Sequence, residues 1–263
     1  MIPIFRKIRH NLLRENKFKR YLIYAIGEII LVVIGILIAL SINNWNENKK
    51  TQEFEITILK NIQEDILADK IDLALNLQYH KEMVKNEQLL LNFLLNDQTQ
   101  NSNNIEFTTA LGIDLITAFH NASFNNLQNN DIGLINNNRL YKKITRFYDF
   151  YSTAIIQMEN EHDYSNTYDE KFPYFKKHFT LADKKSSIHL KSDMPQDTWN
   201  QDFERYNFSI KNLDLLKADE EFRIVLSESL FIGSVKIDFY NQILEKIEEL
   251  NNDIKDELIL LEK

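Results

Sequence analysis

The chain has 263 residues, a formal net charge of −8 and no cysteine, which excludes disulfide bonds and thiol chemistry. Beyond the first 20 residues, and leaving out Glu28, it carries 24 basic and 37 acidic residues, a net charge of −13. Such an acidic surface repels nucleic acid, so DNA- and RNA-binding roles are poorly supported. With only five glycines and three prolines, the chain lacks the turn residues that sheet architectures need, and helices are favoured.

A basic segment and an apolar run open the chain. Residues 1–20 contain seven lysines and arginines and one glutamate, and they precede the run from Tyr21 to Trp45, YLIYAIGEIILVVIGILIALSINNW. A helix needs about 20 residues to cross a bilayer, so we expect residues 21–45 to be a transmembrane helix. The positive charge before this run predicts a cytoplasmic N-terminus, and aromatic residues lie at both of its ends.

These features predict a single-pass protein of the inner membrane, in which residues 46–263 form an acidic domain outside the cytoplasm. A cleaved signal peptide is the alternative, because Ala39-Leu40-Ser41 resembles a cleavage site. Signal peptides have apolar cores of about 7–15 residues, and this run is longer, so we expect it to be retained as an anchor.

Two features of the run go beyond anchoring. Gly27, Gly35 and Ala39 lie on one face of the helix, and small residues allow two spanning helices to approach closely. They are a candidate association face, although glycine is also common in spanning helices. Glu28 is a candidate polar site within the membrane, because ionisable groups there often mark function. Its position near the cytoplasmic edge favours a side chain that reaches towards water or the basic segment.

The outer domain is predicted to be an all-α bundle of long helices. Apolar residues at steps of three, four or seven predict a helix over 47–95, and residues 105–128 are expected to form one or two shorter helices. Asn138 is expected to cap a helix over 138–168, and Pro173 to end or bend the chain's helical course. Residues 180–201 are polar and without periodicity, which predicts a flexible surface loop. A last helix is expected over 218–261, where residues 240–254 have coiled-coil-like spacing that equally suits a bundle.

The candidates for chemistry are few. Glu159 and His162 form one Glu-x-x-His pair, but a di-iron site needs a second such pair and two further glutamates, so a solvated helix face is favoured. Neither a nucleophile elbow nor a glycine-rich phosphate loop is present in the sequence. Asn125, Asn129, Asp131 and Arg139 are weak candidates for a small-ligand pocket, since asparagines also serve as turn and cap residues. We therefore expect no catalytic residue, cofactor or metal.

Three stretches together carry a family resemblance: FRKIRHNLL near the N-terminus, YAIGEIILVVIGILIALSINNWNE in the span, and SFNNLQNNDIGLINNNRLYKKITRFYDFY from Ser123 to Tyr151. In these stretches the chain resembles an uncharacterised, domain-of-unknown-function family of short single-pass bacterial membrane proteins. The resemblance implies an anchor and an N-terminus in the cytoplasm. It implies no activity, cofactor or catalytic residue.

Two functions fit these observations. The favoured one is a non-catalytic interaction or scaffold module of the bacterial envelope, which associates with itself or with another envelope protein. The alternative is an extracytoplasmic sensor of a small ligand, because helical bundles near a membrane can pass helix shifts through a span. A sensor with about 20 cytoplasmic residues would need a separate effector chain.

The topology is testable in intact cells. Protease added to spheroplasts is expected to remove a C-terminal epitope tag and to leave an N-terminal tag protected, because the positive charge retains the N-terminus inside. The intact mass of the purified chain should include residues 1–41. A mature protein that begins at Ile42, or a protected C-terminal tag, would contradict the prediction.

Overall fold

A computed structural model describes residues 18–95, 102–113, 115–129, 134–160, 166–191 and 200–263. The chain divides into two compact units, Met1–Glu55 and Ile56–Lys263. Each unit is described by itself. The secondary structure is mostly helical, as predicted, but it also includes two strands.

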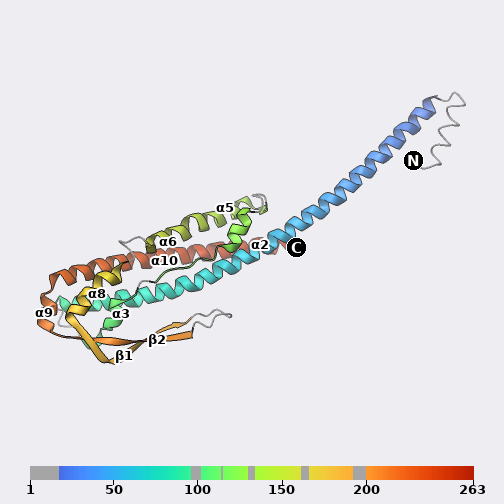
Figure 1. Ribbon diagram of the computed structural model, residues 1–263. Coiled ribbons are helices and arrows are strands. Elements are labelled where there is room, and N and C mark those ends of the chain that lie inside the picture. The colour runs from blue at the N-terminus through green and yellow to red at the C-terminus, as the bar shows by residue number, and fades with distance from the viewer. Residues whose placement is uncertain (1–17, 96–101, 114, 130–133, 161–165, 192–199) are drawn as a thin grey trace. The chain divides into compact units, whose positions relative to one another are not determined.

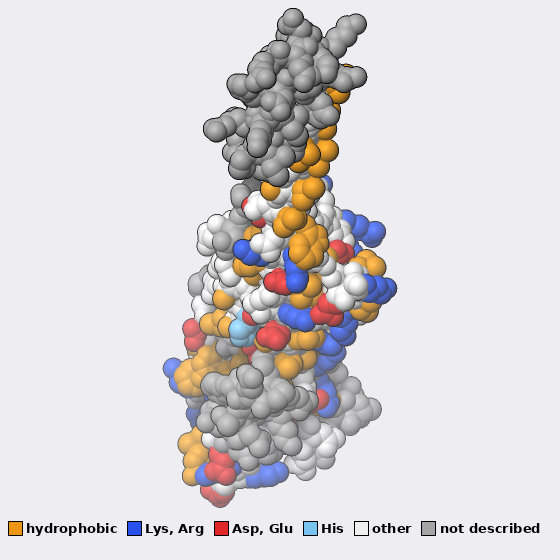
Figure 2. All heavy atoms as spheres, turned by 90° about the vertical axis from the view of Figure 1, so that its right-hand side faces the viewer, with side chains coloured by type: hydrophobic (Ala, Val, Ile, Leu, Met, Phe, Trp, Pro, Cys, Tyr) orange, Lys and Arg blue, Asp and Glu red, His pale blue; other side chains and the backbone are white. Residues whose placement is uncertain are grey.

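In the first unit the described residues belong to helix α2 (Phe18–Leu94), which continues into the second unit. From Ala25 onward α2 is long and apolar enough to cross a membrane, with an 18-residue window of mean hydropathy 2.8 that is 0% buried by the protein. Figure 2 shows hydrophobic side chains along this part of the helix, whereas charged side chains of both signs mix over the visible face of the second unit. The predicted helix at 21–45 is thus present, with the composition shared by membrane spans and signal sequences.

Two long antiparallel helices organise the second unit: the part of α2 after Glu55, and α10 (Glu220–Leu261) (Figure 1). Gln63 Nε2 donates to Asn251 Oδ1 at 2.8 Å, and the rings of His80 and Tyr240 stack with centroids 5.4 Å apart. The most deeply buried positions of α10 recur at steps of three and four: Phe222, Leu226, Ser229, Gly233, Lys236, Tyr240, Ile243, Ile247, Leu250 and Ile254. The helices predicted over 47–95 and 218–261 are therefore confirmed.

The helix predicted over 138–168 is divided. It consists of α5 (Asn138–Arg146), the π-helical turn η2 (Phe147–Ser152) and α6 (Thr153–Asn160), and α8 (Thr167–His178) follows. The cap of α5 is Asn137 rather than Asn138, since its side chain accepts from Leu140 N. Pro173 does not end α8, which continues to His178.

Short elements complete the unit. Residues 102–129 contain the 3-10 turn η1 (Ser102–Asn104), α3 (Phe107–Leu111) and α4 (Ala122–Asn129). The helix α9 (Leu213–Ala218) precedes α10. Figure 1 places α3, α9 and the strands at one end of the second unit and α5 towards the other.

The predictions of an all-α domain and of a loop at 180–201 were wrong in part. Strands β1 (Phe179–Lys191) and β2 (Asn200–Ile210) pair in an antiparallel ladder that runs from Phe179↔Ile210 to Lys191↔Asn200. The backbone N–H and C=O groups of each strand form hydrogen bonds with those of the other strand. This pairing does not require that apolar and polar residues alternate along either strand. Residues 192–199 of the predicted loop lie outside the described residues.

The buried side chains form two apolar clusters, and the interval between them along both long helices contains several buried polar side chains. The first core includes Leu59 and Ile66 of α2 with Tyr240 to Leu258 of α10. The second core includes Leu90 and Leu94 with Phe222 and Leu226. Between these cores lies a layer of fully or almost fully buried polar side chains, here called the polar layer: His80, Glu87, Lys171, Ser229 and Lys236.

At Gly233 the backbone of α10 lies close to Val84 of α2. A Cβ atom at this position would lie 2.5 Å from Cγ2 of Val84. We expect Gly233→Ala to destabilise the protein by about 1–3 kcal/mol because of overpacking, and to cost less when Val84→Ala is also present. Thermal unfolding of the full chain in detergent, followed by circular dichroism, would measure this. Gly27→Ala is the control, since a Cβ there meets nothing within 4 Å. A Gly233→Ala protein as stable as the wild type would refute the prediction.

Candidate functional site: a pocket of aromatic and basic side chains

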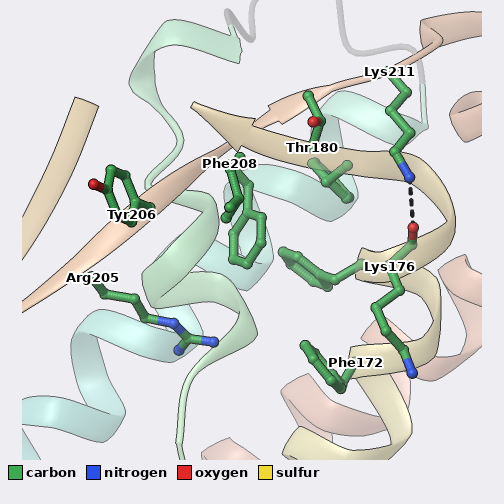
Figure 3. Close-up of a pocket in the computed structure, with 10 residues that line it drawn as sticks. Phe172, Lys176, Thr180, Arg205, Tyr206, Phe208 and Lys211 are labelled. Atoms are coloured by element: carbon green, nitrogen blue, oxygen red, sulfur yellow. Dashed lines mark hydrogen bonds between the residues drawn. The ribbon is translucent and has the colours of Figure 1, made fainter. Parts of the chain in front are cut away.

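A pocket opens where the C-terminal end of α8 meets the paired strands (Figure 3). Its volume is about 510 Å³, within the range of about 300–1,000 Å³ that is typical of small-molecule sites. The described residues that line it are aromatic, aliphatic, basic or hydroxyl-bearing: Phe172, Phe175, Lys176, Phe179, Thr180, Leu181, Arg205, Tyr206, Phe208 and Lys211. We call it the Arg205 pocket.

The junction of helix and strands holds the pocket in shape. The helix α8 ends at His178 and the chain passes directly into β1 at Phe179, which has extended backbone angles. The backbone N–H of Lys211, just after β2, donates to the carbonyl of His178 at 2.9 Å. Its Nζ donates to the carbonyl of Lys176 at 2.7 Å (Figure 3). The last carbonyl groups of α8, which a helix leaves without internal partners, are thereby satisfied by the end of β2.

The floor of the pocket is a cluster of aromatic rings. Phe175 and Phe179 are 1% and 3% exposed, and their stacked rings have centroids 4.7 Å apart. Phe208 of β2 meets Phe175 edge-on at 5.5 Å. Each buried ring removes a large apolar area from water, and such ring pairs add further stability. The floor is therefore rigid, and it belongs to the second core.

The charged side chains of the pocket lie above aromatic rings. The guanidinium carbon of Arg205 lies 5.8 Å from the ring centre of Phe208 and 5.9 Å from that of Tyr168. The ammonium group of Lys176 lies 5.0 Å from the ring centre of Phe172. Ring faces attract cations, so these contacts orient both groups. Figure 3 shows Arg205 extending from β2 towards the side on which Phe172 lies.

A second contact fixes the strands. The pairing of β1 with β2 is irregular between Leu181 and Lys185, beside the pocket. Opposite this irregularity, Asn207 accepts a hydrogen bond from Thr108 Oγ1 of α3 at 2.9 Å. A bulge of this kind redirects side chains, and here it is anchored to a buried threonine.

The described lining residues offer positive charge, hydroxyl groups and apolar surface. Among its described residues there is no carboxylate, imidazole or thiol that would act as a general base or nucleophile near neutral pH. An acid at the end of α8 is Asp219, the N-cap of α10, whose Oδ2 accepts from Lys177 at 2.7 Å and from His178 at 2.6 Å. That carboxylate connects α8 with α10, and its oxygens already accept hydrogen bonds from Lys177, His178 and Phe222 N.

The polar layer is the second place where ionisable side chains gather, and its side chains are buried from solvent. Lys171 forms an ion pair with Glu87, and both side chains are 0% exposed. Lys171 Nζ also donates to the carbonyl of Ala110 at 3.0 Å, and Ser229 Oγ donates to Glu87 at 2.6 Å. Burial, together with the positive charges of Lys236 and Lys171, lowers the pKa of His80 to about 3, so its ring is neutral at pH 7. These groups specify packing, since solvent does not reach them.

Glu159 corrects one expectation from the sequence. It was assigned to a solvated face, but it is 4% exposed and accepts hydrogen bonds from Thr117 N and Oγ1, each at 2.7 Å, and from Tyr240. Its partner in the motif, His162, lies outside the described residues. In the described part of the chain, no group of three or more metal-binding side chains comes together.

The other predicted residues lie apart from the Arg205 pocket. Asn125 and Asn129 are exposed on α4, and Asp131 lies outside the described residues. Arg139 lines a different hollow of about 460 Å³ on α5. That hollow is lined by Asn138, Arg139, Lys142, Lys143 and Arg146, so the structure does not join Arg139 with the two asparagines in one pocket.

The residues singled out in the apolar run lie in the first unit. A Cβ added at Gly27 or at Gly35 would meet nothing within 4 Å, and Ala39 is exposed. Glu28 is partly exposed. This face of α2 is thus uncovered by the described protein, and its role in association stays a prediction.

Sequence reasoning missed the Arg205 pocket because its residues come from two segments that carry no motif. The available signal was the stretch FERYNFSI at 203–210, in which aromatic and aliphatic residues recur among polar ones, as in a half-buried strand. Its partner β1 carries apolar pairs only at its two ends, Phe179 with Leu181 and Ile188 with Leu190, separated by the polar stretch at 183–187.

The fold and the site define a class: a helical domain that follows a long apolar helix and carries an open cation-lined pocket. The chain matches the family of unknown function DUF6090 over residues 28–193, and it belongs to that family. This confirms the resemblance seen in the sequence. No curated protein and no solved structure matches the chain. The matched residues end before β2, so Arg205 and Phe208 lie beyond them.

The junction behind the pocket depends on pH. Burial opposes ionisation of Asp219, but hydrogen bonds from Lys177, His178 and Phe222 N outweigh it and lower the pKa to about 2. An acid with a depressed pKa stabilises the fold above its unfolded pKa, here 3.8, and this contribution is lost as the pH falls through about 2.

Asp219→Asn keeps an oxygen for the helix cap but removes the charge. We expect the variant to be less stable than wild type by about 1–2 kcal/mol at pH 7, and this difference to vanish between pH 4 and 2. Urea unfolding across that range would measure both proteins. Asp214→Asn, in the exposed first turn of α9, is the control. A constant difference over the whole range would contradict the assignment.

Proposed function

We propose that this protein is a membrane-anchored, non-catalytic interaction module of the bacterial envelope, and that the Arg205 pocket is its recognition site. In this proposal residues 21–45 span the inner membrane, residues 1–20 stay in the cytoplasm and residues 46–263 lie outside it. The carrying observation is the composition of the pocket: aromatic rings and cations, with no described residue that would perform acid–base or nucleophilic chemistry.

The burial pattern of the domain supports binding over catalysis. Its buried charged groups already have partners inside the protein: Lys171 pairs with Glu87, and Glu159 accepts hydrogen bonds from Thr117 and Tyr240. Its open hollows carry arginines, lysines and aromatic side chains. Arginine and aromatic residues are the types that contribute most to binding at interfaces.

The partner in this proposal is another envelope protein or a second copy of the chain. The uncovered small-residue face at Gly27, Gly35 and Ala39 supports association within the membrane, since nothing in the described protein occupies it. An outer domain with an excess of acidic residues does not favour nucleic acid as a partner.

A sensor is the second candidate, and one observation favours it. The helix α2 is continuous from Phe18 to Leu94, so the same helix carries the apolar run and contributes His80 and Glu87 to the polar layer. A ligand that shifted this helix at the polar layer would also move the apolar run. The signal would then need an effector chain on the cytoplasmic side.

Photocrosslinking in native membranes tests the interaction module. A photoreactive amino acid at Thr180, an exposed residue of the pocket, is expected to form a covalent adduct of defined mass with a protein. The adduct should be lost in an Arg205→Gln background. The same amino acid at exposed Lys255 of α10 is the control and should give no such adduct. A Thr180 adduct that is absent, or that is unaffected by Arg205→Gln, would refute the proposal.

A further inference from the structure

We propose that the group bound in the Arg205 pocket is an anion, a carboxylate or a phosphate, carried on a flat apolar body. Arg205 and Lys176 receive the negative charge, and Phe172 and Phe208 receive the apolar part. This inference rests on the proposed function, since it names the chemistry that the module recognises.

The charge of the pocket is opposite to that of the protein. Its described lining residues include three cations, Lys176, Arg205 and Lys211, and no acid, although the whole chain has a net charge of −8. Lys211 is engaged with the carbonyl groups at the end of α8. Arg205 and Lys176 have no ion pair with a described carboxylate, so their charges are available to a ligand. A cation-lined hollow concentrates anions and excludes other cations.

The geometry of Arg205 suits a planar or tetrahedral oxyanion. Its guanidinium group rests against the rings of Phe208 and Tyr168, and none of its side-chain N–H groups forms a hydrogen bond to a described residue. A guanidinium that contacts aromatic rings keeps N–H donors at its edge, which bind carboxylate or phosphate with two parallel hydrogen bonds. Lys176 adds a second charge from α8, across the pocket from β2.

The rest of the lining requires an apolar partner. Leu181 is 65% exposed and Tyr206 is 49% exposed, and Phe172 is only partly buried. These side chains form an apolar rim around a rigid aromatic floor, so a ring system entering the pocket would remove apolar surface from water on both sides. A simple inorganic anion would leave this surface exposed. The combination therefore fits an anion attached to one or two fused rings, in a volume of about 510 Å³.

Three naphthalene compounds of nearly the same shape separate these requirements. They are 2-naphthoate, 2-naphthyl phosphate and the neutral 2-naphthamide. Each would be titrated by isothermal calorimetry into the full chain in nanodiscs of zwitterionic lipid, with empty nanodiscs as the blank. We expect saturable binding of at least one anion, at least tenfold tighter than binding of the amide. The tighter of the two anions identifies the headgroup as carboxylate or phosphate.

Two arginine variants provide matched controls. Arg205→Gln is expected to weaken binding of the anion by about tenfold or more, because a hydrogen-bonded charge is lost, and to change binding of the amide little. Arg146→Gln should leave binding unchanged, although Arg146 also lies over aromatic rings, 6.0 Å from Phe150 and 5.8 Å from Tyr151. It belongs to the hollow on α5 rather than to the Arg205 pocket.

Several results would overturn the inference. They are failure of both anions to bind, equal binding of the amide, and equal effects of the two arginine variants. Failure here leaves the proposed function standing if the Thr180 adduct still forms and depends on Arg205, since the pocket then binds a partner of different chemistry. Loss of that adduct while 2-naphthoate still binds would instead reject the protein partner and favour the sensor.

Discussion

The buried ion pair between Glu87 and Lys171 is the contact on which the second unit depends. Two charges without access to water are costly, and further hydrogen bonds offset part of that cost. Here Ser229 donates to Glu87 Oε1 and Lys171 donates to the carbonyl of Ala110, whereas Glu87 Oε2 is buried without a hydrogen-bond partner among the described residues. The pair and its hydrogen bonds therefore connect α2, α3, α8 and α10.

The position of the Arg205 pocket follows from that arrangement. The ion pair fixes α8 against both long helices, and the end of α8 receives β2 through Lys211. The aromatic floor then closes the second core beneath the strands. The domain thus pairs Glu87 with Lys171 inside, while Lys176 and Arg205, which form no ion pair with a described carboxylate, remain on the pocket surface. Such a division suits recognition.

The family match covers only part of the chain, residues 28–193. The match to DUF6090 covers α2 from Glu28 and extends to residue 193, so it includes most of the apolar run, the polar layer residues of α2 and Lys171. The cation of the pocket that carries the proposal, Arg205, comes from the chain beyond it. His80, Glu87 and Lys171 of the polar layer therefore belong to the matched region, whereas Ser229 and Lys236 lie beyond it, and the recognition chemistry proposed here also depends partly on residues outside it.

Much of the fold was predictable because its pattern is local. The apolar run at 21–45 and the three-and-four spacing of Tyr240, Ile243, Ile247, Leu250 and Ile254 reflect helix geometry, which is repeated every turn and is legible in one segment. The long helices were accordingly predicted within a few residues of their ends. The same spacing contains Ser229 and Lys236, but their burial was not predicted, since a polar residue at a core position is stable only beside a partner from another element.

The sequence by itself determined the apolar helix, the two long amphipathic helices and the acidic character of the domain, because each of these depends on neighbours along the chain. Only the tertiary structure decided that β1 pairs with β2, that Glu159 is buried against Thr117 and Tyr240, and that Arg205 lies opposite Lys176. These features join residues far apart in sequence, and their free energy arises from desolvation and pairing in three dimensions. No single segment carries that information.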